Sequence, residues 1–254
     1  MNIRKVSAVL LAVFSMSAFA DPLSATDDAA ANTAAIQSAI DAAVPNGTVT
    51  LAEGEFTIDA QLMVTGGVTL VGQGWEQTTV KQTTSGQRVV TLDGGAKLQG
   101  VTVTGGKITS EWTSGAGVVV KNGTISWCRI TGNTTGIGAT VTVKECYGAG
   151  VSFYDGQGQI DHSIVDANIS ANHVGGSCYG GGIGIRNHTG PVTIDTCLIY
   201  GNSAPNGNGG GIAAYLQGSH FRFTVRNSTI AGNSCSGQGG VYVMEYGNSS
   251  SLEL

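Results

Sequence analysis

The chain has 254 residues, of which 11% are charged, and a formal net charge of −5. A weakly acidic chain without a basic patch is not expected to bind nucleic acid. Beyond residue 20 no stretch is long and apolar enough to cross a bilayer, so we expect no transmembrane segment.

Residues 1–20 have the pattern of a secretory signal peptide. Arg4 and Lys5 precede an apolar run, and Ala18 and Ala20 form a small-x-small cleavage site. A membrane anchor is the alternative, but the apolar run is short. Cleavage would leave 10 basic against 17 acidic side chains, a net charge of −7. We therefore expect export through the secretory pathway, to the extracellular space or the bacterial cell surface.

Residues 21–47 are predicted to form a leader and one helix. Ile36, Ile40 and Val44 recur every four residues in an Ala-rich segment, which gives an amphipathic helix with one apolar stripe. Pro45-Asn46-Gly47 should end it. Strand periodicity begins at Thr48, so we expect the helix to cover the open apolar end of a β-structure.

Residues 48–254 contain a repeat that reads Ile-x-x-(Cys/Ser)-x-(Ile/Val)-x-(Gly/Ala)-Asn. Its four copies are 125–133, 160–168, 194–202 and 225–233, the last with Val in the first place, and a looser copy spans 98–106. The asparagines are 35, 34 and 31 residues apart. A period in this range with alternating apolar residues indicates an all-β solenoid of short parallel strands.

Stacking explains the repeat, because equivalent residues lie about 4.8 Å apart on neighbouring coils. Two apolar columns and one column of small residues should point inward. They are Ile125, Ile160, Ile194 and Val225; Ile130, Val165, Ile199 and Ile230; and Cys128, Ser163, Cys197 and Ser228. Asn133, Asn168, Asn202 and Asn233 should form a polar ladder at turns, since Asn tolerates left-handed backbone and its amide can bond to its neighbours.

Three segments near the N-terminus carry a resemblance: residues 32–41 (NTAAIQSAID), 47–57 (GTVTLAEGEFT) and 67–74 (GVTLVGQG). They resemble the N-terminal cap and first coils of the pectate-lyase-like superfamily, and the later repeats resemble β-helix repeats of bacterial surface proteins and autotransporter passengers. Together the resemblance covers nearly all of the mature chain. It implies a right-handed parallel β-helix with an N-terminal capping helix, a scaffold that serves both catalysts and adhesins.

Cys146, Cys178 and Cys235 fall in predicted loops. A disulfide between Cys146 and Cys178 is one option in an oxidising compartment, although five cysteines leave one thiol over. Their spacing fits no zinc motif.

A candidate ligand site lies on the outer face of one sheet. In successive coils its outward positions carry Lys121, Tyr154, Arg186, Tyr215 and Met244. The two tyrosines offer flat faces for sugar rings, and Lys121 and Arg186 offer charge for uronate carboxylates. Asp155, the next residue along, and His188, on the following turn, are the nearest titratable partners. The alternative is that these are ordinary solvated side chains.

If this face is catalytic, we expect a lyase that cleaves by β-elimination rather than a hydrolase. A lyase needs a base and a cation that neutralises the uronate, and the resemblance suggests Arg186, Lys121 and His188 for these roles. The polygalacturonase-type succession of Asn-x-Asp, Asp-Asp and Gly-His-Gly is absent, and Asp27-Asp28, in the leader of the cap helix, does not match it. Trp112, in the insertion 107–115 beside Glu111, could stack on sugar or fold back over the coil.

Asp161 and Asp195 occupy one repeat position in adjacent coils, where two carboxylates would repel each other. A bound Ca²⁺ would neutralise them. Alternatively, Asp195 pairs with Arg226 while Asp161 stays hydrated.

Two functions remain open from the sequence. One is a secreted or surface-exposed bacterial protein that binds, and could cleave, acidic polysaccharide. The other is a non-catalytic adhesin or passenger-type scaffold. The strand pattern continues to residue 254 without a closing coil, so we expect either a truncated C-terminus or another chain that covers this end.

Overall fold

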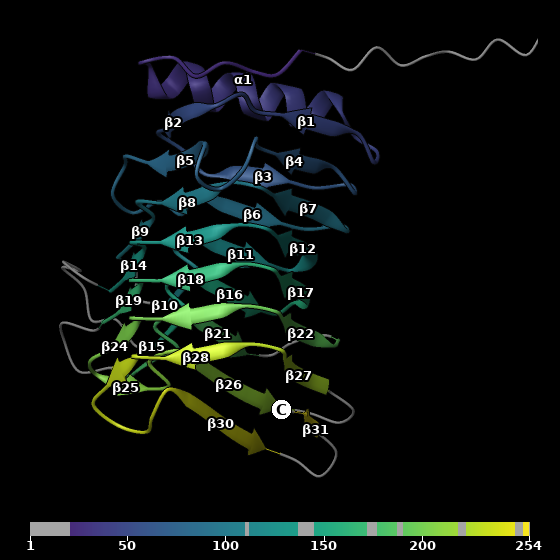
Figure 1. The fold of residues 1–254 in the computed structure, drawn as a ribbon. Helices are drawn as coiled ribbons and strands as arrows, with labels where there is room; N and C mark the ends of the chain where they lie inside the picture. The colour runs from purple at the N-terminus through teal and green to yellow at the C-terminus, as the bar shows by residue number, and fades with distance from the viewer. Residues whose placement is uncertain are drawn as a thin grey trace, which may run out of the picture.

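The chain winds into a stack of coils in which every strand pairs in parallel with its equivalent in the next coil (Figure 1). This is a computed structural model that describes residues 21–109, 112–136, 145–171, 177–186, 190–217, 222–246 and 251–253. The predicted signal peptide lies outside the described residues. The parallel β-helix predicted from the repeat is confirmed.

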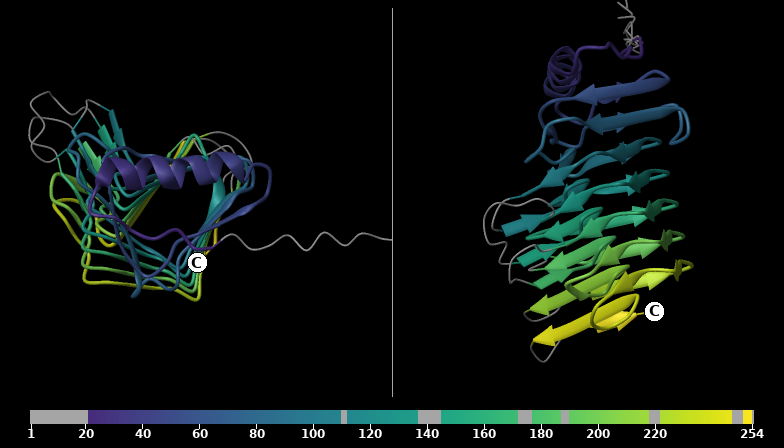
Figure 2. Two further views of the ribbon diagram at one scale, coloured as in Figure 1. Left: turned by 90° about the horizontal axis from the view of Figure 1, so that it is seen from above. Right: turned by 90° about the vertical axis from the view of Figure 1, so that its left-hand side faces the viewer.

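Helix α1 (Ala29–Ala42) lies across one end of the stack (Figure 2). Asp28 caps its N-terminus, accepting hydrogen bonds from the backbone N–H groups of Ala30 and Ala31. Ile36 and Ile40 are fully buried against the first coil, whereas Val44 lies beyond the helix end and is exposed. The predicted capping helix is therefore confirmed with a shorter apolar stripe. No helix in the described part is long and apolar enough to span a membrane.

Three long sheets form the walls of the stack. The first sheet comprises β1 (Thr48–Thr50), β4 (Thr69–Val71), β7 (Ala96–Gln99), β12 (Asn122–Ser126), β17 (Gln157–Asp161), β22 (Val192–Asp195), β27 (Arg222–Arg226) and β31 (Ser251–Glu253). The second sheet comprises β2 (Gly54–Ile58), β5 (Thr78–Gln82), β8 (Thr102–Thr104), β13 (Arg129–Thr131), β18 (Ile164–Asp166), β23 (Leu198–Tyr200) and β28 (Thr229–Ala231). The third sheet comprises β3 (Leu62–Val64), β6 (Val90–Leu92), β11 (Val118–Val120), β16 (Val151–Tyr154), β21 (Ile183–Arg186), β26 (Ile212–Gln217) and β30 (Val241–Tyr246).

Two smaller sheets lie between the second and third strands of the coils. One comprises β9 (Lys107–Ile108), β14 (Thr134–Thr135), β19 (Ile169–Ser170), β24 (Ser203–Ala204) and β29 (Ser234–Cys235). The other, here called the lateral sheet, comprises β10 (Trp112–Ser114), β15 (Glu145–Tyr147), β20 (Ser177–Tyr179) and β25 (Gly207–Asn208). The sequence analysis treated these segments as loops, because strands of two or three residues are too short to show periodicity.

The predicted inward columns are confirmed by strand register. Ile125 pairs with Ile160, Ile160 with Ile194 and Ile194 with Val225. All four are buried, as are the equivalent residues Ile130, Val165 and Ile199 of the second sheet. The core is thus one continuous apolar column that no single coil could bury alone.

The asparagine ladder is present and almost fully buried. Asn133 Nδ2 donates to Asn168 Oδ1, Asn168 Nδ2 to Asn202 Oδ1, and Asn202 Nδ2 to Asn233 Oδ1, each at 3.0 Å. The same oxygens accept the backbone N–H of the preceding asparagine, for example Asn133 N to Asn168 Oδ1 at 3.0 Å. Each rung therefore joins two coils through both side chain and backbone.

The left-handed residue at this turn is the one before the asparagine, which corrects the sequence analysis. Gly132, Ala167, Gly201 and Gly232 have φ between 53° and 66°. The asparagine itself turns its amide into the stack, which accounts for its low exposure.

A glycine in each coil faces the ladder and opens a strand of the third sheet. A Cβ added at Gly182 would lie 2.7 Å from Gly211 O and 2.9 Å from Asn202 Nδ2. Gly117, Gly150 and Gly211 have equivalent neighbours. Glycine and asparagine are therefore required together, because the carboxamide occupies the space that a side chain at the glycine would need.

Two of the cysteines form a disulfide and two are buried free thiols, both of which the sequence analysis considered. Cys146 and Cys178 pair in register in the lateral sheet and form a disulfide. Cys128 and Cys197 are free thiols in the core, where burial raises the pKa of Cys128 to about 12 and that of Cys197 to about 11. These two cysteines act as small buried hydrophobes.

We predict that Asn168→Ala lowers the free energy of unfolding by about 1–3 kcal/mol, because it leaves buried donors and acceptors on two coils without partners. Asn122→Ala is the matched control, since Asn122 is exposed on the first sheet. Urea unfolding followed by circular dichroism would measure both. Equal midpoints would show that the ladder contributes nothing.

A second stability prediction concerns the glycine column. Gly182→Ala should cost about 1–3 kcal/mol, because its methyl group would overlap a backbone oxygen and an amide. Gly240→Ala is the control at the equivalent position of the last coil, where the nearest atom to an added Cβ is 3.8 Å away. Thermal unfolding should separate the two variants. If Gly182→Ala melts with the parent protein, the close approach described here is wrong.

Candidate functional site

The outward positions of the third sheet align as the sequence analysis expected. Tyr154 pairs with Arg186, Arg186 with Tyr215 and Tyr215 with Met244. However, the lateral sheet packs over this face, as shown by contacts between β15 and β21. A Cβ added at Gly184 would lie 2.3 Å from Gly148 N. Much of the expected ligand-binding face is therefore covered.

Tyr215 does not offer the open ring that the sequence analysis expected. It is 7% exposed, and its ring meets those of Tyr179 and Tyr147 edge-on, with centroids 4.7 and 5.5 Å away. Burial raises the pKa of Tyr215 above its ordinary value. The tyrosine belongs to an internal aromatic cluster between two sheets.

Arg186 is already engaged within the protein. Its Nη1 forms an ion pair with Glu145 and donates to Tyr147 Oη at 2.9 Å. The guanidinium also lies 4.7 Å from the centre of the Tyr147 ring. Desolvation lowers the pKa of Arg186. A uronate ligand would have to displace the Glu145 carboxylate, which the sequence analysis did not foresee.

The other predicted residues of this face are dispersed. Lys121 and Asp155 are exposed, and Asp155 has a left-handed backbone, with φ of 51°. His188 and Glu111 lie outside the described residues. The side chains of Tyr154 and Trp112 also lie outside the described part. Those of the predicted residues that the structure describes form no catalytic cluster.

Asp161 and Asp195 are adjacent in the first sheet but have separate partners. Asp195 receives hydrogen bonds from Arg226 Nε and Asn227 Nδ2, both at 3.0 Å. Asp161 receives one from Gln159 Nε2 at 2.6 Å and lies 3.1 Å from His162 Nδ1. The Asp195–Arg226 pair is confirmed. The expected hydrated Asp161 is wrong, because Gln159 and His162 occupy its carboxylate.

These partners also bear on the predicted calcium site. Each carboxylate is already bonded to protein groups, so no shared cation is needed to hold the two coils together. Across the described ranges, no cluster of three or more His, Cys, Asp or Glu side chains could hold a metal ion.

The sequence analysis missed the corner between the first and second sheets. One residue per coil occupies it with left-handed backbone: Trp127, His162, Thr196 and Asn227, with φ between 46° and 55°. Gly100 holds the same place one coil earlier, with φ of 63°. A non-glycine residue in this conformation costs about 1–2 kcal/mol, so Trp127 and His162 are not placed there by backbone preference.

Trp127 and His162 form an exposed aromatic stack along this corner. Their ring centroids are 4.5 Å apart with planes inclined by 16°, and Trp127 is 56% exposed. The spacing follows from the coil repeat, since the two residues occupy equivalent positions. The stack therefore presents a flat aromatic surface to solvent at this corner.

Two hollows adjoin this stack, and Trp75 and Trp127 line both. The larger one has a volume of about 500 Å³. It is lined by Trp75, Trp127, His162, Ser163, Ile164, Thr196, Cys197, Leu198 and Asn227. The smaller one, of about 380 Å³, is lined by Gly74, Trp75, Glu76, Gln77, Gly100 and Trp127. We refer to the two together as the corner groove.

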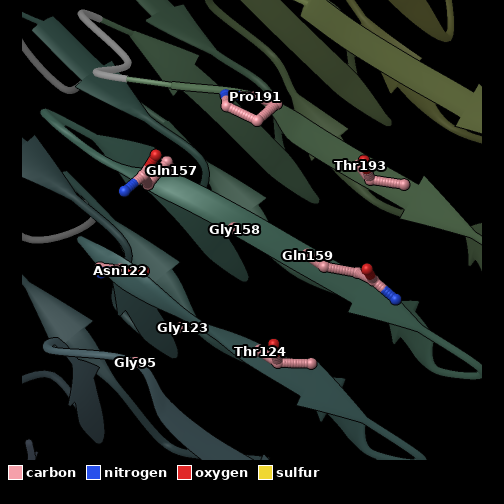
Figure 3. A pocket seen from close by; sticks show the side chains of 9 residues that line it. All are labelled: Gly95, Asn122, Gly123, Thr124, Gln157, Gly158, Gln159, Pro191 and Thr193. Carbon is pink, nitrogen blue, oxygen red and sulfur yellow. The ribbon is translucent and has the colours of Figure 1, made fainter. Parts of the chain in front are cut away.

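A polar groove of about 400 Å³ lies on the neighbouring outer face of the first sheet. Figure 3 shows Thr124, Gln159 and Thr193 on its successive strands, where they pair in register. Gln159 links this face to the corner, because it donates to Asp161 and Asp161 contacts His162. Hydroxyl and amide groups thus adjoin an aromatic surface.

The arrangement at the corner supports two kinds of chemistry. Its indoles can stack on the apolar face of a sugar ring. The Asp161–His162 contact fixes the imidazole by one nitrogen, which is how a proton-exchanging histidine is commonly oriented. The sequence signal for this site was weak, because Trp127 and His162 fill unspecified places of the repeat.

Comparisons with known proteins give only a distant likeness. No protein-family model matches the sequence, and no curated protein matches it. Among solved structures, ORF18 of Geobacillus virus E2 is similar at 12% identity and a TM-score of 0.37, over 87% of this chain. The chain spans 58% of that protein's length.

We predict that the Asp195 carboxylate stabilises the corner in a pH-dependent manner. Hydrogen bonds from Asn227 and then Arg226 lower the pKa of the Asp195 carboxyl below its ordinary value. This stabilisation should be complete above the unfolded pKa and disappear as the pH falls through the lower folded pKa. Asp195→Asn should therefore destabilise the protein at about pH 6 more than at about pH 2.5. Urea midpoints at both pH values would test this, and a difference independent of pH would contradict it.

Proposed function

We propose that this protein is an exported, surface-associated β-helix protein that binds polysaccharide through the corner groove. The observation that carries the proposal is the Trp127 side chain, which is 56% exposed and stacked on His162 beside a hollow of about 500 Å³. Rigid aromatic surface exposed next to hydrogen-bonding groups is suited to sugar rings, which have an apolar face and a polar rim.

The fold, the course of the groove and the signs of export also support this proposal. The capping helix and first coils support membership of the pectate-lyase-like superfamily, where parallel β-helices bind glycans. The groove follows the axis of the stack, so neighbouring units of one chain could contact successive coils. The proposed secretion agrees with the signal-like residues 1–20 and with the Cys146–Cys178 disulfide, which is typical of oxidising compartments.

The acidic-polysaccharide version of this function depended on Lys121 and Arg186. Because Arg186 is paired with Glu145, we place recognition at the corner, where stacking requires no negative charge on the ligand. Cleavage by β-elimination remains a separate proposal, for which His162, held by Asp161, replaces His188 as the candidate base.

The second candidate is a non-catalytic adhesin or passenger-type scaffold. The uninterrupted ladder and the disulfide between coils favour it, since both stiffen a stalk without requiring a ligand. In that case the corner groove would bind no glycan.

Glycan-array binding followed by calorimetry tests the proposal. Trp127→Ala should weaken binding about tenfold, equivalent to about 1.4 kcal/mol. Tyr200→Ala is the control, because Tyr200 is 40% exposed on the second sheet but does not line the corner groove. An absorbance assay for unsaturated uronate products would run in parallel.

Three outcomes would contradict the proposal. Binding that is lost in Lys121→Ala but unchanged in Trp127→Ala would place the site on the third sheet. Equal losses in Trp127→Ala and Tyr200→Ala would indicate a nonspecific surface effect. Absence of any glycan binding would favour the scaffold alternative.

A further inference from the structure

The smaller hollow of the corner groove is built from three successive coils. The turn between β4 and β5 supplies Trp75 and Glu76, the corner after β7 supplies Gly100, and the corner after β12 supplies Trp127. Its volume is about 380 Å³. This is enough for one small ring or a substituted amine, rather than for a long stretch of polymer.

One face of Trp127 is available to this hollow. Strand β12 lies between β7 and β17, so the coil of Trp127 lies between those of Gly100 and His162. His162 stacks on one face of the indole, at 4.5 Å. The opposite face is therefore directed towards the coil of Gly100, and Trp127 lines the smaller hollow together with Gly100 and Trp75.

Gly100 keeps the hollow open. Trp127 and His162 occupy the equivalent position in the next two coils, whereas Gly100 has no side chain. A Cβ at this position would lie 3.1 Å from Gly72 O, with φ of 63°. Because Gly100 lines the hollow, a larger residue at this position would reduce its volume.

A carboxylate completes the lining. Glu76 is exposed at the hollow and has no ion-pair partner within the described ranges. Arg129, two residues after Trp127, pairs with Asp166. Glu76 is the only charged side chain among the residues that line the hollow, so a uronate would meet negative charge there.

We infer that this hollow is a binding site for an ammonium group, carried by a protonated amino sugar of the bound polysaccharide. Indole faces attract cations through their π electrons, and an adjacent carboxylate adds direct charge attraction. The inference rests on the proposed glycan-binding function and specifies its ligand class. It also agrees with the net charge of −7 that the chain would carry after signal-peptide cleavage, which favours cationic over anionic ligands.

The test compares two oligosaccharides of equal length, one of glucosamine and one of its neutral N-acetylated form, by calorimetry on the full protein. Choline serves as a third probe, because it carries the ammonium chemistry without a sugar. Glu76→Gln should weaken glucosamine-oligomer binding at least tenfold and N-acetylated-oligomer binding less than twofold. Glu53→Gln, an exposed carboxylate outside the groove, should change neither. Higher salt should weaken only the glucosamine interaction.

A second variant tests the cavity rather than the charge. In Gly100→Asn, the asparagine can adopt the left-handed backbone of this position, but its side chain would partly fill the hollow. The substitution should therefore weaken the binding of both choline and the glucosamine oligomer. Its fold can be verified by the unfolding midpoint. Unchanged binding of both probes would overturn the site.

The outcomes separate this inference from the proposed function. Equal binding of both oligosaccharides, with no effect of Glu76→Gln, would overturn the ammonium site while glycan binding stands. Choline binding that depends on Glu76, without any oligosaccharide binding, would support the ammonium site and contradict the glycan function. No binding of any probe would overturn both.

Discussion

The buried asparagine ladder is the interaction on which the rest of the structure depends. Each carboxamide bonds to the amide of the next coil and to backbone groups of two coils, for example Asn168 Nδ2 to Ile130 O at 2.9 Å. Leaving such buried groups unpaired would cost about 1–3 kcal/mol each, so the register between coils is strongly specified. The glycine beside each asparagine is fixed by the same contact, and the apolar columns align as a consequence.

Fixed register also creates the corner groove that we propose as the binding surface. Because the coils stack in register, residues at one unspecified position of the repeat lie above one another at the corner between the first and second sheets. There, Trp127 and His162 stack at 4.5 Å because their coils are neighbours. The same register brings Asp161 and Asp195 side by side. Asp161 contacts His162 on the corner, whereas Asp195 pairs with Arg226 at the end of β27. The side chains at the corner can therefore change without changing the scaffold.

The sequence predicted the solenoid, the capping helix and the inward columns because these follow from local periodicity. The ladder was also predictable, since asparagine recurs at one place in each repeat. The site was not, because the sequence does not show that the lateral sheet covers Arg186 and Tyr215. Nor does it show that Trp75 and Trp127, 52 residues apart, line the same hollow. Those contacts are made by connecting segments between the strands of the long sheets, and the length of these segments varies from coil to coil.

Amide hydrogen exchange tests the central claim most directly. The backbone N–H groups of Asn133, Asn168 and Asn202 donate to the side-chain oxygen of the next rung at 2.9–3.0 Å. They should exchange as slowly as amides in the middle of the first sheet, such as that of Ile160, because only unfolding of the stack exposes them. Exchange as fast as in the exposed turn around Ser85 would show that the rungs are open in solution and that the ladder does not hold the coils in register.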